Sequence, residues 1–402
     1  MSFRAIASVV VFLLLCGWAG WSGGRVVQRY DFVRDASTDR QTRIQLVGPM
    51  LGEARRASVL EQAVALAAQV AMPPAPLAGM AVGVSPVLDS VRRPALDRYT
   101  QAFAVEPLES GHFLRDWHLD VAMVILVALP VLILFGPGLD PLLAMAAGLL
   151  GSIVGFLAST PEFASGGVWM RLLFWLAITA VYGWFWSMVR VWLDKVRGGE
   201  AFAIAVYGLI VFVLPGLGAL LARTVTPVPS AAEVVAEVRK AAMPTELRDA
   251  QDLVRFHTAH PSVVPNENAA EFDQRKVKSI RAWDQLAAAP LDAYESAVTR
   301  HRFVANVLRI FSPAAAAQGA LLEVAGTGVS RYSSFAAQVA EFSQKQWAPF
   351  FLSRAEKGQR LTQPELAQLP RFTYEEPSLM SLLIALLLTV PIALAAVLVS
   401  RR

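Results

Sequence analysis

Six long stretches of this 402-residue chain contain no Asp, Glu, Lys or Arg. Each stretch holds roughly 18–24 residues, which is the length that an α-helix needs to cross about 30 Å of hydrocarbon. A buried helix of a soluble protein rarely has so long a charge-free run. We therefore predict six membrane-spanning helices. The runs lie between Arg4 and Arg25, Asp120 and Asp140, Asp140 and Glu162, Arg171 and Arg190, Glu200 and Arg223, and Glu376 and Arg401.

The composition agrees with a membrane location. Hydrophobic residues make up 55% of the chain and charged residues only 17%, whereas soluble domains carry about a quarter charged residues. The net charge of +4 is small and argues against nucleic acid as a main partner. A single cysteine, Cys16, excludes an internal disulfide. Because it lies in an apolar run, we expect a lipid-facing or packing thiol.

Two of the six helices have alternative interpretations. The first run resembles a signal peptide, with Arg4 followed by an apolar core at 5–15 and small residues at 17–19. Apolar residues continue through Trp21, which favours a membrane anchor. The second and third runs are joined only by residues 136–141, so this pair could be a re-entrant hairpin. We favour two full crossings.

Positive residues in the short loops predict the orientation. The loop at 190–200 carries Arg190, Lys195 and Arg197, and the opposite short loop at 159–168 carries no Lys or Arg. The tail ends in two arginines. Both termini are therefore expected in the cytoplasm, which places the two long polar regions outside.

We predict an all-α fold, namely a polytopic membrane protein whose two extracytoplasmic regions are helical and pack together. Within the larger region, we expect helices at 231–242, 245–257, 268–288, 291–309 and 313–358, the last interrupted at Gly326 and Gly328. The expected order is a first transmembrane helix (5–24), an extracytoplasmic helical region (25–116), four transmembrane helices (117–222), a larger extracytoplasmic domain (223–376) and a last transmembrane helix (377–400).

Motifs for chemistry are absent. No GxxxxGK[ST] phosphate loop occurs, so we do not expect an enzyme and expect no cofactor. The sequence WSGGR at 21–25 superficially echoes an ABC signature loop, but small residues where a helix leaves the bilayer explain it better. His257 and His260 have a spacing that metal sites use, yet no further ligand pattern accompanies them. We assign no catalytic, cofactor or metal residue. The lack of mid-membrane charges also counts against a secondary transporter.

Several stretches, taken in order, resemble one family. The chain is similar to the permease subunits of a bacterial ABC exporter family, which are type-2 permeases with a large extracytoplasmic domain of unassigned function. The resemblance implies a separate ABC ATPase and a second permease subunit, in a homo- or heterodimer, in the bacterial inner membrane. The stretches are PLAGMAVGVSPV (76–87), YGWFWSMVRVW (182–192), TPVPSAAEVVAEVR (226–239), FHTAHPSV (256–263), FSPAAAAQGALLEVAGTG (311–328) and LPRFTYEEPSL (369–379).

The sequence departs from this family at its cytoplasmic side. Similar permeases begin with an amphipathic cytoplasmic helix and carry a charged helix between the second and third spans. Here four residues precede the first run, and the turn is GPGLDP. Any ATPase contact is therefore expected through Arg190, Lys195 and Arg197. The same reduction supports an alternative, a non-transporting permease-like scaffold whose external helices bind a partner protein. A membrane enzyme acting on lipid or envelope polymer is a third interpretation, without a catalytic cluster to support it.

Overall fold

The computed structural model describes residues 3–38, 58–67, 70–82, 91–103, 119–159, 166–196, 199–240, 269–359, 368–376 and 380–400, together with a few single residues between these ranges. These parts are almost entirely helical, which confirms the all-α prediction. In the same residues, β-structure is limited to one antiparallel pair, β1 (Val70–Ala71) and β2 (Val91–Arg92).

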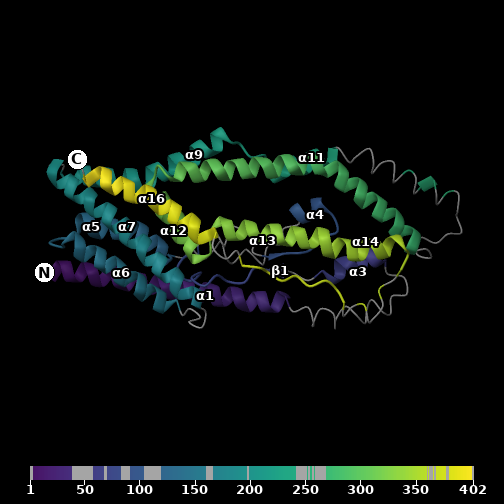
Figure 1. Cartoon of the computed structure of the whole chain (residues 1–402), viewed down its shortest axis with the longest axis horizontal. Coiled ribbons are helices and arrows are strands. Elements are labelled where there is room, and N and C mark those ends of the chain that lie inside the picture. The colour runs from purple at the N-terminus through teal and green to yellow at the C-terminus, as the bar shows by residue number, and fades with distance from the viewer. Residues whose placement is uncertain are drawn as a thin grey trace.

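The apolar helices gather at one end of an elongated molecule, and both chain ends lie there (Figure 1). These helices are α1 (Phe3–Thr38), α5 (Val121–Phe135), α6 (Pro141–Ala158), α7 (Gly166–Val196), the continuous stretch α8–η1–α9 (Glu200–Gly208, Leu209–Val213, Leu214–Val225) and α16 (Met380–Ser400). The other end holds α3 (Val59–Leu66), α4 (Arg98–Phe103), α13 (Val329–Phe342), η2 (Ser343–Trp347) and α14 (Ala348–Glu356). The long helix α11 (Ala269–Arg309) extends between the two ends, and α12 (Pro313–Ala325) lies beside the apolar helices.

Within the described residues, four helices, rather than the six predicted, are both long and apolar enough to cross a membrane. They are Phe3–Tyr30, Pro141–Ala158, Gly167–Val196 and Glu200–Val225. The other two candidates, α5 and the apolar stretch Ile384–Ser400 of α16, are shorter. The α5 helix has 15 residues because the carboxylate of Asp120 caps its start, accepting a hydrogen bond from Met123 N at 2.8 Å, and Gly136 ends it. Fifteen residues span about 22 Å, which is less than the hydrocarbon thickness.

A proline in α5 explains how α5 packs against its neighbours. Pro130 has no N–H to donate to the carbonyl of Leu126, four residues earlier. The hydroxyl of Tyr182, on α7, donates to that carbonyl at 3.0 Å, and the hydroxyl of Tyr207, on α8, donates to the carbonyl of Val127 at 3.1 Å. Two tyrosines thus pair with carbonyl groups next to the proline, as an apolar environment requires.

The glycines of α1 permit backbone contact with its neighbours. A Cβ added at Gly20 would lie 2.1 Å from the carbonyl oxygen of Gly155 on α6, and one at Gly23 would lie 2.0 Å from that of Gly79. Small residues that let backbones approach closely are typical of helix interfaces in membranes. The glycines of WSGGR therefore serve packing. Cys16, also on α1, is fully buried, as a packing thiol.

The two polar helical regions pack together, as predicted. Apolar side chains of α3 share a core with Val277 of α11 and with Trp347 and Phe351 near α14. At the start of α3, the buried carboxylate of Asp273, on α11, accepts hydrogen bonds from the Ser58 hydroxyl and from Val59 N. The interruption expected at 289–290 is wrong, because α11 continues through Pro290. Figure 1 shows α11 bending along its length, the usual accommodation of an internal proline.

The short helix α12 lies among the apolar helices. Its residues Ala316, Ala317 and Ala320 are fully buried in the same core as α5, α7 and α16. The small alanine side chains allow this close packing. Consequently, a segment from the polar region expected at 223–376 forms part of the apolar bundle.

Candidate functional site

Arg190, which the sequence analysis assigned to an ATPase contact, holds the turn between α5 and α6. Its Nη1 donates to the carbonyl of Ile133 at 2.5 Å and to that of Leu139 at 3.1 Å. The last carbonyls of a helix have no intrahelical partner, and basic side chains commonly bind them. Arg190 is half-buried in this position. It therefore fixes the α5–α6 turn against the end of α7.

The other two residues of this prediction are placed differently. Lys195 is exposed in the last turn of α7. Five residues separate it from Arg190, which corresponds to about 140° around the helix axis, so the two side chains leave α7 on different sides. Arg197 lies outside the residues that the structure describes, as do His257 and His260.

A second group of charged residues lies where the apolar bundle meets the polar helices. Arg331, at the start of α13, binds Glu376 through two hydrogen bonds of 2.9 Å each, from Nε and Nη2 to the two carboxylate oxygens. Its side chain is 3% exposed, and its guanidinium lies 5.4 Å from the ring centre of Tyr374. A two-point ion pair of this kind fixes geometry as well as contributing energy. We call Arg171, Arg331 and Glu376 the boundary cluster.

Arg171 connects the same carboxylate to the apolar bundle. It lies near the start of α7, its Nη1 donates to the carbonyl of Val324 at 2.9 Å, and its Nη2 lies 3.6 Å from Glu376. The Arg171 side chain is 7% exposed. Glu376 therefore bridges arginines from α7 and α13, just before the chain enters α16. The boundary cluster joins elements of the bundle to elements of the polar domain.

The turn between α12 and α13 is built around Glu323. Its buried carboxylate accepts hydrogen bonds from the backbone N–H of Ser330, at 3.3 Å, and from the Ser330 hydroxyl. Burial raises the pKa of Glu323, and the bonds from Ser330 oppose that rise. Gly326 ends α12 in the left-handed region, with φ of +79°. A Cβ at Gly328 would lie 2.4 Å from the Glu323 carboxyl carbon. Both glycines of the GTG sequence are thus required by this turn.

The arrangement is suited to mechanical connection between α7, α13 and the segment that leads into α16. The Ser330 hydroxyl is paired with the Glu323 carboxylate, and the Thr327 hydroxyl lies 3.5 Å from the carbonyl oxygen of Leu322; we assign no nucleophile and base. Within the described part of the chain, no group of three or more His, Cys, Asp and Glu side chains could hold a metal ion. Both arginines are buried and would lose their charged partner if the pairs broke, so the boundary cluster opposes relative movement of α7, α13 and the segment that leads into α16.

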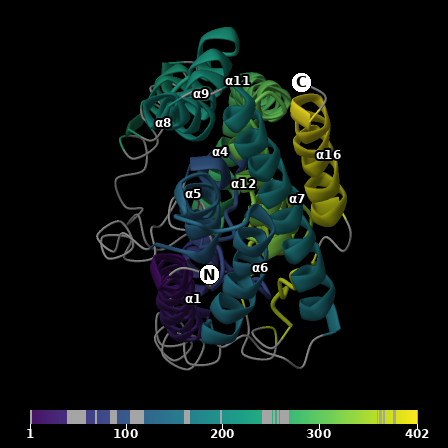
Figure 2. The ribbon, with the colours of Figure 1, turned by 90° about the vertical axis from the view of Figure 1, so that its left-hand side faces the viewer.

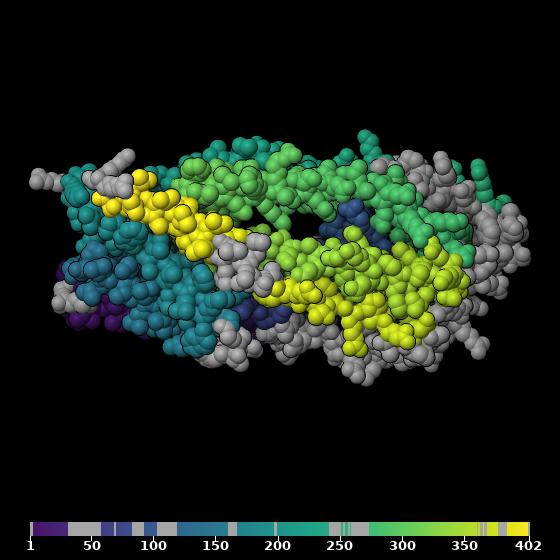
Figure 3. Space-filling model, in the orientation of Figure 1, coloured from purple at the N-terminus to yellow at the C-terminus, as the bar shows by residue number. Residues whose placement is uncertain are grey.

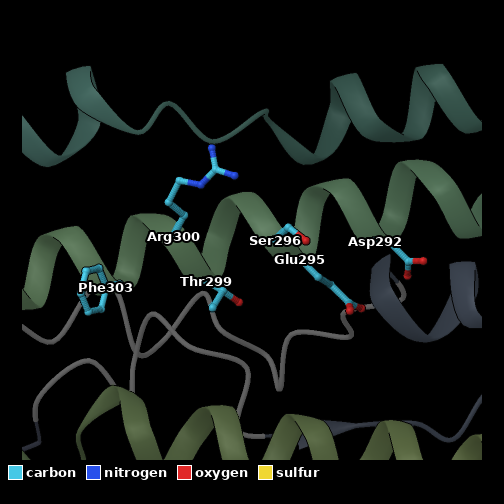
Figure 4. Close-up of a pocket in the computed structure, with 6 residues that line it drawn as sticks. All are labelled: Asp292, Glu295, Ser296, Thr299, Arg300 and Phe303. Carbon is cyan, nitrogen blue, oxygen red and sulfur yellow. The ribbon is translucent and has the colours of Figure 1, made fainter.

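An open cavity of about 690 Å³ lies along α11. Figure 3 shows the hollow between α11 and α13, and Figure 4 shows side chains from successive turns of α11 that line it. Asp292 at one end is already paired with Arg98 at 2.8 Å, while Phe303 lies at the other end (Figure 4). The lining mixes both charges with one aromatic ring and indicates no particular ligand. The lining residues are Asp292, Glu295, Ser296, Thr299, Arg300 and Phe303.

The sequence contained only part of the signal for the boundary cluster. Arg171 and Glu376 flank the fourth and sixth charge-free runs, so their position at a membrane edge could be predicted. Arg331 lies in an ordinary helical stretch, and nothing in its neighbours indicates burial. The pairing of residues from three separate elements is a tertiary feature that one sequence does not provide.

Comparison with known proteins gives one partial match. The model of a family described as a domain of unknown function (DUF3526) matches residues 231–375, less than half of the chain. This range includes Arg331, Glu323 and Tyr374, and it ends one residue before Glu376. Neither the curated proteins nor the solved structures give a match.

Proposed function

We propose that the chain is a membrane-spanning permease subunit of an ABC-type exporter, working with a separate cytoplasmic ATPase and a second permease. It would reside in the bacterial inner membrane and cross it six times, with both termini cytoplasmic and with 25–116 and 223–376 largely outside. The resemblance of the sequence to type-2 permeases supports this proposal. The structure also supports it, because the apolar helices lie together at one end of the molecule and both chain ends lie at that same end (Figure 1).

The observation that carries the proposal is that five of the six apolar helices share one core, against which α8–η1–α9 packs through partly buried side chains. Buried residues of α5 and α16 pack with those of α1, α6 and α7, and Figure 2 shows α7 between α6 and α16. The 15-residue α5 and the 21-residue α16 thus share a core with helices that are long and apolar enough to cross a membrane. A bilayer can thin locally around a short helix at a modest free-energy cost. Six crossings also return the chain to the side on which it started.

Coupling to an ATPase would use the end of the molecule that contains the α5–α6 turn. Arg190 ties this turn to α7, and Lys195 is the exposed cation nearby. A push on the turn would therefore act on α5 and α7 together. We propose that Lys195 and Arg197 make the contact, and that Arg190 acts by holding the turn in place.

The alternative is a non-transporting, permease-like scaffold whose external helices bind another protein. The observation that favours it is the small size of the turn at 136–140, which offers an ATPase little surface. The same chain would then use its polar domain for binding and its apolar bundle as an anchor.

Co-purification distinguishes these functions. The full chain is co-expressed with the products of the adjoining genes, among which the proposal expects an ABC ATPase and a second permease, and is purified in detergent. We expect a stable complex, which the double change Lys195→Glu and Arg197→Glu should weaken. Arg302→Glu, at an exposed arginine of α11, is the matched control and should leave the complex intact. A complex unaffected by the double change would refute the contact, and the absence of any ATPase complex would favour the scaffold.

A further inference from the structure

The C-terminal part of α11 runs alongside α9 for several turns. At the outer end of α9, the Thr226 hydroxyl lies 3.2 Å from Nδ1 of His301. Further along, a Cβ added at Gly218 would lie 3.9 Å from Leu308. From the first pair to the second, the position moves back by eight residues on α9 and forward by seven residues on α11. The two helices are therefore antiparallel here. At 1.5 Å per residue, α11 therefore continues alongside α9 for about 11 Å from the outer end of α9 toward the interior of the apolar bundle.

Contacts with α16 give an independent measure of the same depth. A Cβ added at Gly319, in the middle of α12, would lie 3.1 Å from Leu388 and 3.6 Å from Nη1 of Arg309. Leu388 follows the first residue of α16, Met380, by eight residues, which is about 12 Å along the helix. The two contacts thus place Leu308 and the Arg309 guanidinium, both at the end of α11, at similar distances inside the apolar bundle.

One side of this corner is apolar and exposed. The exposed fractions are 68% for Phe303, 46% for Ile310 and 72% for Phe311. Leu220 and Leu221 of the neighbouring α9 are exposed as well. Large exposed apolar surface is unfavourable in water and marks contact with another apolar phase.

The single charge between residues 303 and 312 does not oppose burial in lipid. This charge is Arg309, whose Nη1 donates to the side-chain oxygen of Asn306 at 3.2 Å and lies close to Gly319 on α12. The guanidinium is therefore directed toward the protein. The exposed side of the corner keeps its apolar character.

The backbone of the corner is also largely paired. The N–H groups of Ile310, Phe311 and Ser312 donate to carbonyls of the preceding turn at 3.0–3.2 Å. The Ser312 hydroxyl accepts a bond from Ala315 N at 3.3 Å, and Pro313 has no N–H to satisfy. Irregular backbone is tolerated in hydrocarbon only when its polar groups are satisfied within the protein.

We propose that the α11–α12 corner, residues 303–312, enters the outer half of the bilayer, and that its exposed side contacts the acyl chains of the outer leaflet. The chain would thus bind lipid through a segment that does not span the membrane, next to the surface of α9. This inference rests on the membrane location proposed above.

Site-directed spin labelling in phospholipid vesicles tests the depth directly. The background is the full chain with Cys16→Ala, which removes its single thiol. Labels are placed at Phe311→Cys and Phe303→Cys. The reference positions are Phe212→Cys, an exposed residue in the middle of the fifth predicted span, and Glu295→Cys, an exposed residue on the polar part of α11. Each label is scored by its collisions with oxygen, which concentrates in lipid, and with a nickel chelate, which stays in water. A thermal melt confirms that each labelled variant is folded.

The proposal expects the label at 311 to behave like that at 212, with an oxygen-to-nickel ratio several-fold above that at 295, and the label at 303 to lie between them. Nickel access at 311 equal to that at 295, with 212 still in lipid, would overturn the corner proposal alone. Nickel access at both 311 and 212 would overturn the membrane location itself. Protection of 311 from both reagents would show a protein partner in place of lipid, and would also reject the proposal.

Discussion

The hydrogen bond between Tyr182 and α5 gives the sharpest quantitative prediction. Tyr182→Phe removes the hydroxyl that donates to Leu126 O at 3.0 Å. Because Pro130 cannot supply an N–H to this carbonyl, the oxygen is left buried without its side-chain partner. Such a loss costs about 1–3 kcal/mol in protein interiors, and hydrogen bonds between membrane helices contribute about 0.6–1.7 kcal/mol. We expect a destabilisation of about 1–2 kcal/mol.

The matching change, Pro130→Ala, restores the missing donor. With an N–H at position 130, Leu126 O has an intrahelical partner, so Tyr182→Phe should then cost little. The predicted coupling free energy in the double-mutant cycle is about 1 kcal/mol, above the scatter of about 0.3–0.5 kcal/mol seen for independent sites. Ser187→Ala is the control, because this buried α7 hydroxyl donates to Gly183 O of its own helix at 2.8 Å. Its loss should be insensitive to residue 130.

Equilibrium unfolding in mixed micelles, followed by circular dichroism, measures each corner of the cycle. The reasoning fails if Tyr182→Phe costs the same free energy in the natural chain and in the Pro130→Ala background, since the tyrosine would then not be replacing the proline's missing donor. It also fails if Ser187→Ala shows the same coupling as Tyr182→Phe, because that would indicate a general softening of α7.

Three further predictions concern packing, the boundary cluster and helix capping. Gly20→Ala should lower stability by about 2 kcal/mol or more through overpacking against α6, whereas Gly208→Ala, whose Cβ would meet no atom within 4 Å, should be neutral; equal thermal midpoints for the two would contradict the close approach. Glu376→Gln should destabilise by about 1–3 kcal/mol, less than a fully buried pair because Glu376 is 40% exposed, and Glu375→Gln is the neighbouring control whose melting temperature should not change. Ser58→Ala removes the N-cap of α3 and should cost about 1 kcal/mol, read from faster amide hydrogen exchange in that helix; unchanged exchange would reject the capping role.

The charge-free runs located the helices of the bundle because an uncharged stretch has a clear energetic preference for lipid. Helix length was less predictable, since α5 is shortened by a local event, the capping of its start by Asp120. The predicted interruption at Pro290 was wrong for a related reason. Proline disfavours a helix locally, but packing along both sides of α11 maintains the helix there. The alanines of α12 predicted a helix and gave no information on burial, because alanine suits a helix surface and a tight interface equally. Interactions between separate elements, such as those of Arg331, lie beyond what local patterns contain.

The α7 helix connects the α5–α6 turn, at one end of the apolar bundle, to the boundary cluster at the other. Arg171, Tyr182 and Arg190 lie on this one helix, and each donates a hydrogen bond to a carbonyl of another element: Val324 of α12, Leu126 of α5, and Ile133 of α5 with Leu139 of the following turn. Donors at both ends and in the middle leave α7 little freedom to slide without breaking buried bonds. A displacement imposed at the α5–α6 turn would therefore move α7 as a rigid body. Arg171 and Glu376 would pass this movement on to α13 in the polar domain. The boundary cluster makes the polar domain a part of any movement of the bundle, whether the chain transports a substrate or anchors a partner.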